Sequence, residues 1–255
     1  DSWIRDYGPN FLISKRGEGA FNDWTFNAWG NKYEALKQDE RIPCLLEPVL
    51  KVPRFTPEMV LEGGAIDVNG EGCVLTTEQC LLHPNRNPQL SRAEIETFLK
   101  NYLGVTKVLW LGEGIVGDDT DGHIDDIARF VNPTTVACIV EANSRDENYR
   151  FLQENHERLQ TAVDQNGAKL SVIKLPCPEP VYDRGVRLPA SYANFYIANE
   201  VVLVPIFDDP RDVDALGLLQ ELFPNRKVHG LRCHDVVAGL GAIHCVTQQQ
   251  PQPPL

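Results

Sequence analysis

The 255-residue sequence predicts an α/β fold built from similar modules in a circular array. A polar residue, a strand, a turn, a second strand, a helix and a third strand recur from Glu62, from His123 and from Asn194. A partial copy starts at Asp6, and the segment around Cys245 resembles the opening of another. A repeat of roughly 60–70 residues is typical of a propeller, in which the head of each module faces the centre. The alternative is an ordinary α/β domain whose hairpins merely look alike.

The elements follow from apolar periodicity and turn residues. Strands are expected at 11–14, 64–67, 73–76, 105–111, 124–131, 136–141, 171–175, 192–197, 201–206 and 227–231. Helices are expected at 31–39, 91–103, 146–166 and 213–222. The clearest is 91–103, where Ser91 and Glu94 form a capping box and Gly104 ends the helix.

Residues 1–250 are expected to form a single catalytic domain, and the proline-rich residues 251–255 a disordered tail. The chain begins Asp1-Ser2-Trp3, and its only methionine is Met59. We therefore expect that an N-terminal piece is missing.

Composition excludes several classes of protein. A net charge of −12 argues against non-specific nucleic-acid binding and fits a cationic small molecule, although acidity also simply favours solubility. No run of about 18 apolar residues and no signal peptide is visible, so no membrane span and a cytoplasmic location are expected. The seven cysteines show no C-x-x-C spacing, which makes a zinc site improbable. Most, such as Cys73 and Cys138, are expected to be inert core thiols.

Four stretches could carry chemistry. His123 and Asp125 are two apart at a strand start and would share a face, where a histidine can transfer protons and an aspartate can bind a cation. The alternative is a surface histidine in the acidic loop 118–121. Asp6 precedes a rigid Gly-Pro turn and could grip a guanidinium, with Trp3 stacking on it; it could also pair with Arg5 on the surface.

Glu62 precedes two glycines that allow close packing, so it could be a buried partner of an imidazole or an exposed strand residue. The last of the four stretches, Gly239 to Gln248, presents Cys245 after a glycine-rich turn. This cysteine could be a nucleophile or a small buried thiol.

These stretches together resemble the agmatine deiminase and bacterial peptidyl-arginine deiminase family. The motifs appear in order over nearly the whole chain: Trp3-Ile4-Arg5-Asp6-Tyr7-Gly8-Pro9, Glu62-Gly63-Gly64, Gly122-His123-Ile124-Asp125, Ser191-Tyr192-Ala193-Asn194-Phe195-Tyr196 and Ile243-His244-Cys245-Val246-Thr247-Gln248-Gln249-Gln250-Pro251. The resemblance implies the guanidino-group-modifying superfamily and a five-bladed α/β propeller, which the missing N-terminal segment would complete.

The resemblance also implies hydrolysis of a guanidine to a urea and ammonia without metal or cofactor. Agmatine would give N-carbamoylputrescine, on the way to putrescine. Alternatives are a deiminase of peptidyl-arginine or another guanidine, an inactive binding protein of the same fold, and a protease-like Cys-His hydrolase. The last leaves Asp6 and Asp125 without a task. A homo-oligomer paired edge to edge is compatible with the sequence but has no signature in it.

The resemblance assigns roles residue by residue: Cys245 as nucleophile, His123 as general acid and base, Glu62 as the acid that orients His123, Asp6 and Asp125 as the guanidinium-binding carboxylates, and Trp3 and Asn194 as pocket residues. His244 is expected on a strand, pointing away from the site, with a structural role. The bound cation and His123 are expected to favour the Cys245 thiolate.

One departure from the family is visible. Leu240 and Ala242 stand where the family usually has small residues before Ile-His-Cys, and their side chains are expected to clash where positive φ is needed.

Overall fold

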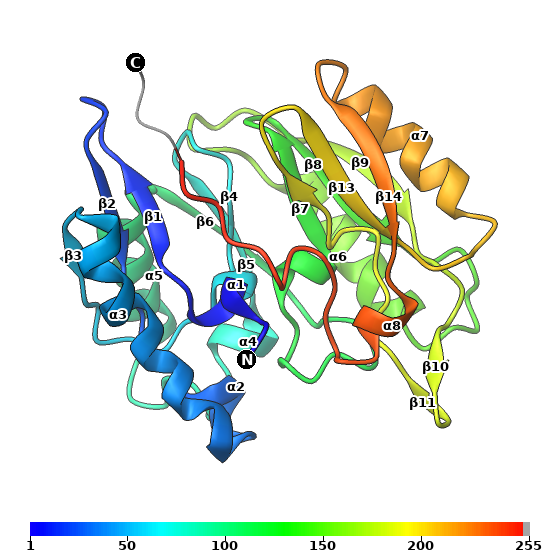
Figure 1. Cartoon of the computed structure of the whole chain (residues 1–255). Helices are drawn as coiled ribbons and strands as arrows, with labels where there is room; N and C mark the ends of the chain where they lie inside the picture. Colours follow the sequence, from blue (N-terminus) through cyan, green and yellow to red (C-terminus); the bar gives the residue numbers. More distant parts are fainter. Residues whose placement is uncertain (252–255) are drawn as a thin grey trace.

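Four three-stranded sheets repeat one topology in the computed structural model, which describes residues 1–251 (Figure 1). In each sheet two antiparallel strands are followed by a third that pairs in parallel with the second. The sheets are β1 (Asn10–Ile13), β2 (Gly19–Asn22) and β3 (Arg54–Phe55); β4 (Asp67–Val68), β5 (Cys73–Thr77) and β6 (Lys107–Leu111); β7 (Ala128–Asn132), β8 (Thr135–Val140) and β9 (Ser171–Pro176); and β12 (Tyr196–Ile197), β13 (Val201–Ile206) and β14 (Lys227–Arg232).

A helix connects the second and third strands of each sheet, as parallel pairing requires a crossover. These helices are α3 (Ile42–Leu50), α5 (Arg92–Leu103), α6 (Tyr149–Thr161) and α7 (Asp212–Leu222). The remaining elements are α1 (Ile4–Tyr7), α2 (Ala28–Asn31), α4 (Glu78–Leu81), α8 (His234–Val237), the 3-10 helices η1 (Glu34–Arg41), η2 (Gly63–Ala65) and η3 (Ile124–Asp126), and the small hairpin β10 (Tyr182–Asp183) and β11 (Val186–Arg187). The predicted α/β class and the repeated module are confirmed.

Helix α5 forms as its sequence predicts. The Ser91 side chain accepts a hydrogen bond from the Glu94 amide, and the Glu94 carboxylate accepts one from the Ser91 amide. Gly104 ends the helix with φ +68°. Ile95 and Leu99 are fully buried, so the apolar face anchors the helix on its sheet.

The predicted strands at 64–67, 124–131 and 192–197 start too early. The chain first forms η2 or η3, or an irregular stretch, and enters β4, β7 or β12 only afterwards. In a regular strand, successive side chains point to opposite faces of the sheet, whereas these bends allow successive side chains to point to one side. The first residues of each module therefore do not follow the alternation of a strand.

Two predicted helices also differ from expectation. The helix predicted at 146–166 is α6, which begins after Asn148 and ends before Ala162, because Ala162 is extended and Val163 pairs with Lys169. The helix predicted at 31–39 is the 3-10 segment η1, which leads into α3. Residues 252–255 of the predicted tail lie outside the described residues.

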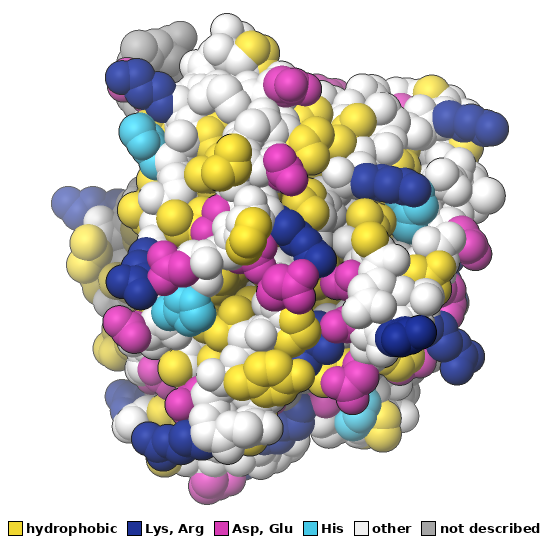
Figure 2. Space-filling model, turned by 90° about the vertical axis from the view of Figure 1, so that its right-hand side faces the viewer, with side chains coloured by type: hydrophobic (Ala, Val, Ile, Leu, Met, Phe, Trp, Pro, Cys, Tyr) yellow, Lys and Arg dark blue, Asp and Glu magenta, His cyan; other side chains and the backbone are white. Residues whose placement is uncertain are grey.

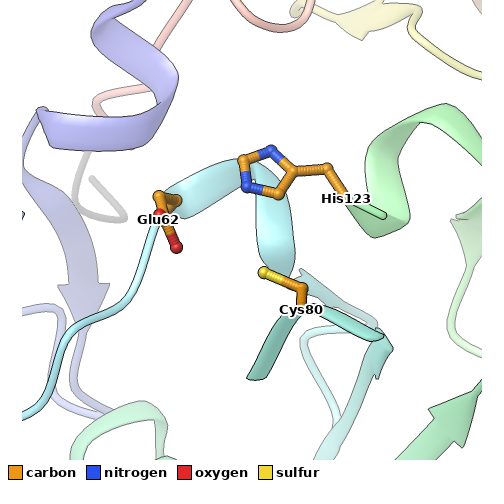
Figure 3. Close-up of side chains that lie close together, drawn as sticks. All are labelled: Glu62, Cys80 and His123. Atoms are coloured by element: carbon orange, nitrogen blue, oxygen red, sulfur yellow. The ribbon is translucent and has the colours of Figure 1, made fainter. Parts of the chain in front are cut away.

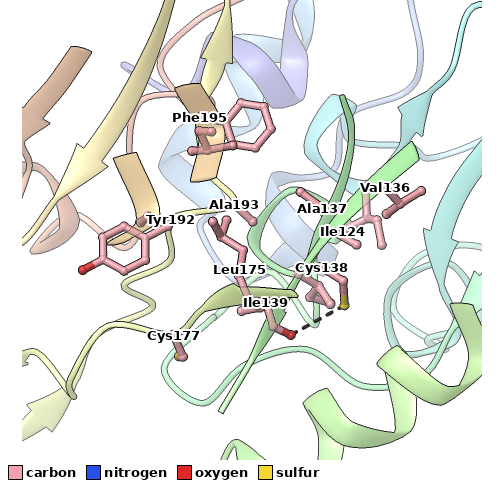
Figure 4. Close-up of a cluster of buried hydrophobic side chains, with 14 of the residues drawn as sticks. Ile124, Val136, Ala137, Cys138, Ile139, Leu175, Cys177, Tyr192, Ala193 and Phe195 are labelled. Atoms are coloured by element: carbon pink, nitrogen blue, oxygen red, sulfur yellow. Dashed lines mark hydrogen bonds between the residues drawn. The ribbon is translucent and has the colours of Figure 1, made fainter. Parts of the chain in front are cut away.

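The largest core cluster joins the second, third and fourth sheets and is drawn in Figure 4. It includes Cys73 and Cys138, both fully buried, as expected of core thiols. Burial raises the pKa of Cys138 to about 12. These thiols therefore stay protonated and unreactive.

Acidic and basic side chains alternate with apolar ones on the face beside β13 and α7, and no continuous basic surface is seen there (Figure 2). Within residues 1–251, no helix combines the length and the apolar character needed to cross a membrane.

Candidate functional site

The head of each module and the segment after α8 meet at one place. Asp6 lies in α1, Glu62 just before η2, His123 just before η3, Asn194 before β12, and Cys245 after α8. The segments around Arg5 and Cys245 meet here too, because the Arg5 amide donates to the Cys245 carbonyl at 3.1 Å. Figure 1 shows the C-terminal segment passing beside α1. The structure thus brings together residues that the sequence separates by up to 240 positions.

Asp6 is held by two donors. Its Oδ1 accepts a hydrogen bond from the Gly64 amide at 2.9 Å, and its Oδ2 accepts one from Trp29 Nε1 at 2.9 Å. Gly64 allows this approach, because a Cβ there would lie 2.6 Å from His123 Nδ1 and 2.7 Å from Asp6 Oδ1. Trp29 was not predicted, and its sequence context carries no signal for the contact.

His123 is fixed by its backbone and by surrounding charge. Asp118 Oδ2 accepts hydrogen bonds from the Gly122 and His123 amides at 2.9 and 3.0 Å. The Nδ1 atom of His123 lies 3.7 Å from Asp6 Oδ1. Burial lowers the pKa of His123, but the charges of Asp6 and Glu62 and the Cys80 thiol more than offset it, so the net pKa is raised well above its ordinary value. The imidazole is therefore protonated in the free protein.

Glu62 lies beside His123 but forms its ion pair elsewhere. Its Oε1 accepts a hydrogen bond from Arg86 Nε at 2.7 Å, and both side chains are fully buried. Arg86 was not anticipated, and only the general rule that a buried carboxylate needs a partner pointed to such a residue. Figure 3 shows the Glu62 carboxylate and the His123 ring turned toward the same space.

Asp125 is fully buried and bonds through one oxygen only. Its Oδ2 accepts a hydrogen bond from His244 Nδ1 at 2.6 Å and lies 3.8 Å from Cys245 Sγ. Its Oδ1 has no hydrogen-bond partner among residues 1–251. Burial raises the pKa of Asp125 to about 7, and the opposing charge of His123 only partly reduces this effect. Asp125 is therefore a buried acceptor with a free oxygen.

His244 differs from its prediction. It lies in a turn rather than on a strand. Burial lowers the pKa of His244 well below its ordinary value, and the charges of Arg129 and Arg5 lower it further. The neutral ring donates from Nδ1 to Asp125, so it positions that carboxylate.

Cys245 is enclosed by Asn194 and Asp126. Asn194 Nδ2 donates to Cys245 Sγ at 3.1 Å and to Asp126 Oδ1 at 2.9 Å, and Asn194 Oδ1 accepts from the His244 amide at 2.9 Å. The Asn194 amide is thus engaged in placing the thiol. Asp126 was not predicted, although its position beside Asp125 was a visible hint.

The thiol is protonated in the free protein. Burial raises the pKa of Cys245 well above its ordinary value, and the negative charges of Asp125, Asp126 and Asp6 raise it further. A cation placed among these carboxylates would reverse that effect.

The turn before Cys245 packs on Trp3. A Cβ at Gly241 would lie 2.5 Å from the Trp3 ring and 3.1 Å from the Cys245 Cβ. Leu240 has φ +70°, as expected for this turn. Ala242 is buried and is not among the residues of the described chain that have a positive φ. A left-handed leucine costs about 1–2 kcal/mol. Only one of the two departures from the family is therefore strained.

Several of these residues line a cavity of about 160 Å³, whereas Glu62, Asp125 and Asn194 are not among its lining residues. Its walls come from α1, α2, the loop before His123 and the turn before Cys245, and include Trp3, Asp6, Trp29, Tyr33, Leu36, Asp119, His123, Asp126, Leu240 and Cys245. Within the acidic loop, Asp118 holds the His123 backbone and Asp121 pairs with Arg86 and Lys32. Asp119, which accepts a hydrogen bond from the Tyr33 hydroxyl, faces the cavity.

Comparison with known proteins gives consistent matches. The family model for Porphyromonas-type peptidyl-arginine deiminase matches residues 1–251. Agmatine deiminase from Ectopseudomonas mendocina is 40% identical over 99% of the chain and 75% of its own length. The structure of agmatine deiminase of Enterococcus faecalis is 40% identical with a TM-score of 0.94, covering 98% of this chain and 74% of that one.

A cysteine-to-serine variant of the C. jejuni agmatine deiminase with substrate bound is 36% identical with a TM-score of 0.89. That alignment covers 96% of this chain and 72% of the C. jejuni chain.

Proposed function

Because the chain belongs to the Porphyromonas-type peptidyl-arginine deiminase family, we propose that it hydrolyses the guanidine of agmatine to N-carbamoylputrescine and ammonia. The observation that carries the proposal is the buried Asp125 carboxylate, whose Oδ2 lies 3.8 Å from the Cys245 sulfur while its Oδ1 has no hydrogen-bond partner among residues 1–251. A buried carboxylate oxygen without a partner among the described residues is costly unless a ligand cation pairs with it.

Each residue then has a proposed role. Asp6 and Asp125 bind the guanidinium, and Trp3 forms the wall behind it. The bound cation lowers the pKa of the Cys245 thiol, whose proton leaves to water. The thiolate attacks the guanidinium carbon, and His123 protonates the departing ammonia. Glu62 orients His123.

The second half of the reaction uses the same groups. An amidine thioether now links the substrate carbon to Cys245. His123, deprotonated by the first step, takes a proton from water, which attacks the same carbon. The C–S bond breaks, the ureido product leaves, and the thiolate is restored. Asn194 holds the sulfur in line throughout.

The size of the cavity favours agmatine over peptidyl-arginine. About 160 Å³ is small beside the 300–1,000 Å³ of common ligand pockets. Asp119 lines the cavity and is proposed to bind the distal ammonium of agmatine, a group that peptidyl-arginine lacks. The product would feed putrescine synthesis.

We propose further that residues 1–250 act as one catalytic domain and that the modules belong to a five-bladed propeller. Four sheets of identical topology and the convergence of their heads support this arrangement. The family matches extend over about three-quarters of the relatives' length.

The test is incubation with agmatine, arginine and an arginine peptide, with measurement of the ureido product. Product from agmatine alone is expected, and Cys245→Ser and Asp6→Asn should each abolish it. Product from the peptide alone would support the peptidyl-arginine alternative. An intact fold without any product would support an inactive binding protein, for which the strained Leu240 is the specific observation.

A further inference from the structure

Behind His123 lies a buried cluster that the proposed reaction uses only in part. Glu62, Cys80 and His123 each offer one donor atom, and these atoms all lie within 4.8 Å of one another (Figure 3). Cys80 belongs to α4, which is capped by the Thr77 side chain, so its position is set by local structure. All three side chains are buried.

Two of the donor atoms are unused. Arg86 occupies Glu62 Oε1, and Oε2 has no partner in the described part of the chain. His123 Nδ1 faces Asp6 and Gly64, while His123 Nε2 is likewise buried without a partner among residues 1–251. Unpaired buried polar atoms are rare in native proteins, and a bound ion, a water or a catalytic role commonly explains them.

We propose that Glu62, Cys80 and His123 form a binding site for Zn²⁺ or a similar thiophilic divalent cation, and that occupation inhibits the enzyme. Sulfur, imidazole nitrogen and carboxylate oxygen are the ligands that zinc takes in proteins. Tetrahedral ligands at about 2.0–2.3 Å from zinc lie roughly 3.3–3.8 Å apart, so donor atoms within 4.8 Å need only a small inward shift.

Inhibition follows from the atoms used. A metal on Nε2 fixes the His123 ring and withdraws it from proton transfer. Binding displaces the thiol proton of Cys80 and the Nε2 proton of His123, so inhibition should strengthen as pH rises. Because the cluster is buried behind the ring that lines the cavity, onset should be slow. The inhibition, but not the binding, rests on the proposed function.

A competing site would use the sulfur of Cys245 instead, and cobalt distinguishes the two. Co²⁺ is added to metal-free Cys245→Ser protein, and the thiolate-to-cobalt absorption band is recorded. The band is expected in Cys245→Ser and lost in Cys80→Ala, with Cys138→Ala as the control for removing a buried thiol. A band lost in Cys245→Ser or surviving in Cys80→Ala overturns the proposal.

Two further measurements keep the result interpretable. If Cys80→Ala does not fold, Glu62→Gln in the Cys245→Ser background should weaken cobalt binding at least tenfold, and unchanged binding would contradict the site. In the active enzyme, Cys80→Ala should raise the half-inhibitory Zn²⁺ concentration at least roughly 100-fold, since even outer-shell changes cost 10–100-fold. If agmatine is not hydrolysed at all, the proposed function fails, while the cobalt band still decides the metal site.

Discussion

Asn194 holds Cys245 at both its sulfur and its backbone. Nδ2 donates to Sγ at 3.1 Å, and Oδ1 accepts from the Cys245 amide at 3.4 Å. One side chain thus sets both the position of the thiol and the turn that presents it.

Asn194→Ala should therefore lower kcat at least tenfold, because the sulfur loses its donor and the Cys245 amide loses its acceptor. Leaving buried groups unpaired should also cost about 1–3 kcal/mol of unfolding free energy. Asn22→Ala is the matched control, because Asn22 is equally buried and donates to the Tyr102 carbonyl away from the site. Steady-state kinetics and urea unfolding decide: equal loss of kcat in both variants would contradict the role of Asn194.

Gly241→Ala should reduce kcat by at least two orders of magnitude. A Cβ at this position would lie 2.5 Å from the Trp3 ring, so either the ring or the nucleophile must move, and a shift of about 1 Å can cost a hundredfold in rate. Gly217→Ala is the control, since a Cβ there meets nothing within 4 Å in the described structure. It should keep full activity and gain about 0.5–1 kcal/mol of stability. Wild-type kinetics in Gly241→Ala would refute the packing argument.

Binding of agmatine to Cys245→Ser should tighten with pH. The pKa of Asp125 is raised to about 7 in the free protein, so below that pH the cation must displace a proton. Affinity measured by calorimetry should rise about tenfold per pH unit below pH 7 and level off above it. His123 titrates nearby, so Asp125→Asn in the same background separates the two groups. If the affinity for agmatine still rises with pH in the Asp125→Asn variant, the titration of His123 rather than of Asp125 is responsible.

Alkylation should reveal that the ligand cation activates the thiol. Burial and three carboxylates raise the pKa of Cys245, so a neutral haloacetamide encounters the protonated thiol, which is a poor nucleophile. A cationic haloacetamidine carries the charge that favours thiolate and should react at least ten times faster, as followed by mass spectrometry. Asp125→Asn should reduce the difference in alkylation rate between the two reagents. Equal alkylation rates for both reagents in the wild type would exclude activation of the thiol by the cation.

Asp119→Asn should raise the KM for agmatine about 10–100-fold, because a hydrogen bond to a charged group contributes about 1.5–3 kcal/mol. Butylguanidine, which lacks the distal ammonium, should be hydrolysed equally well by the wild-type protein and by Asp119→Asn. Asp208→Asn, at an exposed acid on the surface, controls for the lost charge. If Asp119→Asn raised the KM for butylguanidine by a similar factor, binding of the distal ammonium by Asp119 would be contradicted.

The sequence was most informative where a pattern recurs. Glu62, His123 and Asn194 head similar modules, so their convergence could be predicted without coordinates. The local prediction failed at the same places, because the chain bends through η2 and η3 where a strand was expected. Apolar periodicity reports which residues are buried, and does not report where a buried chain leaves the sheet.

Partners from distant segments could not be predicted. Trp29 bonds Asp6 from a left-handed backbone position at φ +53°, and no residue type signals this conformation. Arg86 and Glu62 are 24 residues apart in loops without periodicity. His244 was placed on a strand, and only its turn geometry makes it the partner of Asp125. Each contact depends on tertiary packing, which one sequence does not encode locally.

The junction of Trp3 with the Gly239–Gly241 turn has a consequence for the order of folding. The indole and Gly241, against which it packs, are 238 positions apart in the sequence. Each sheet can form from contacts within its own module, whereas the turn that presents Cys245 is fixed only when two distant segments have docked. We therefore expect the geometry around Cys245 to be among the last features to form during refolding.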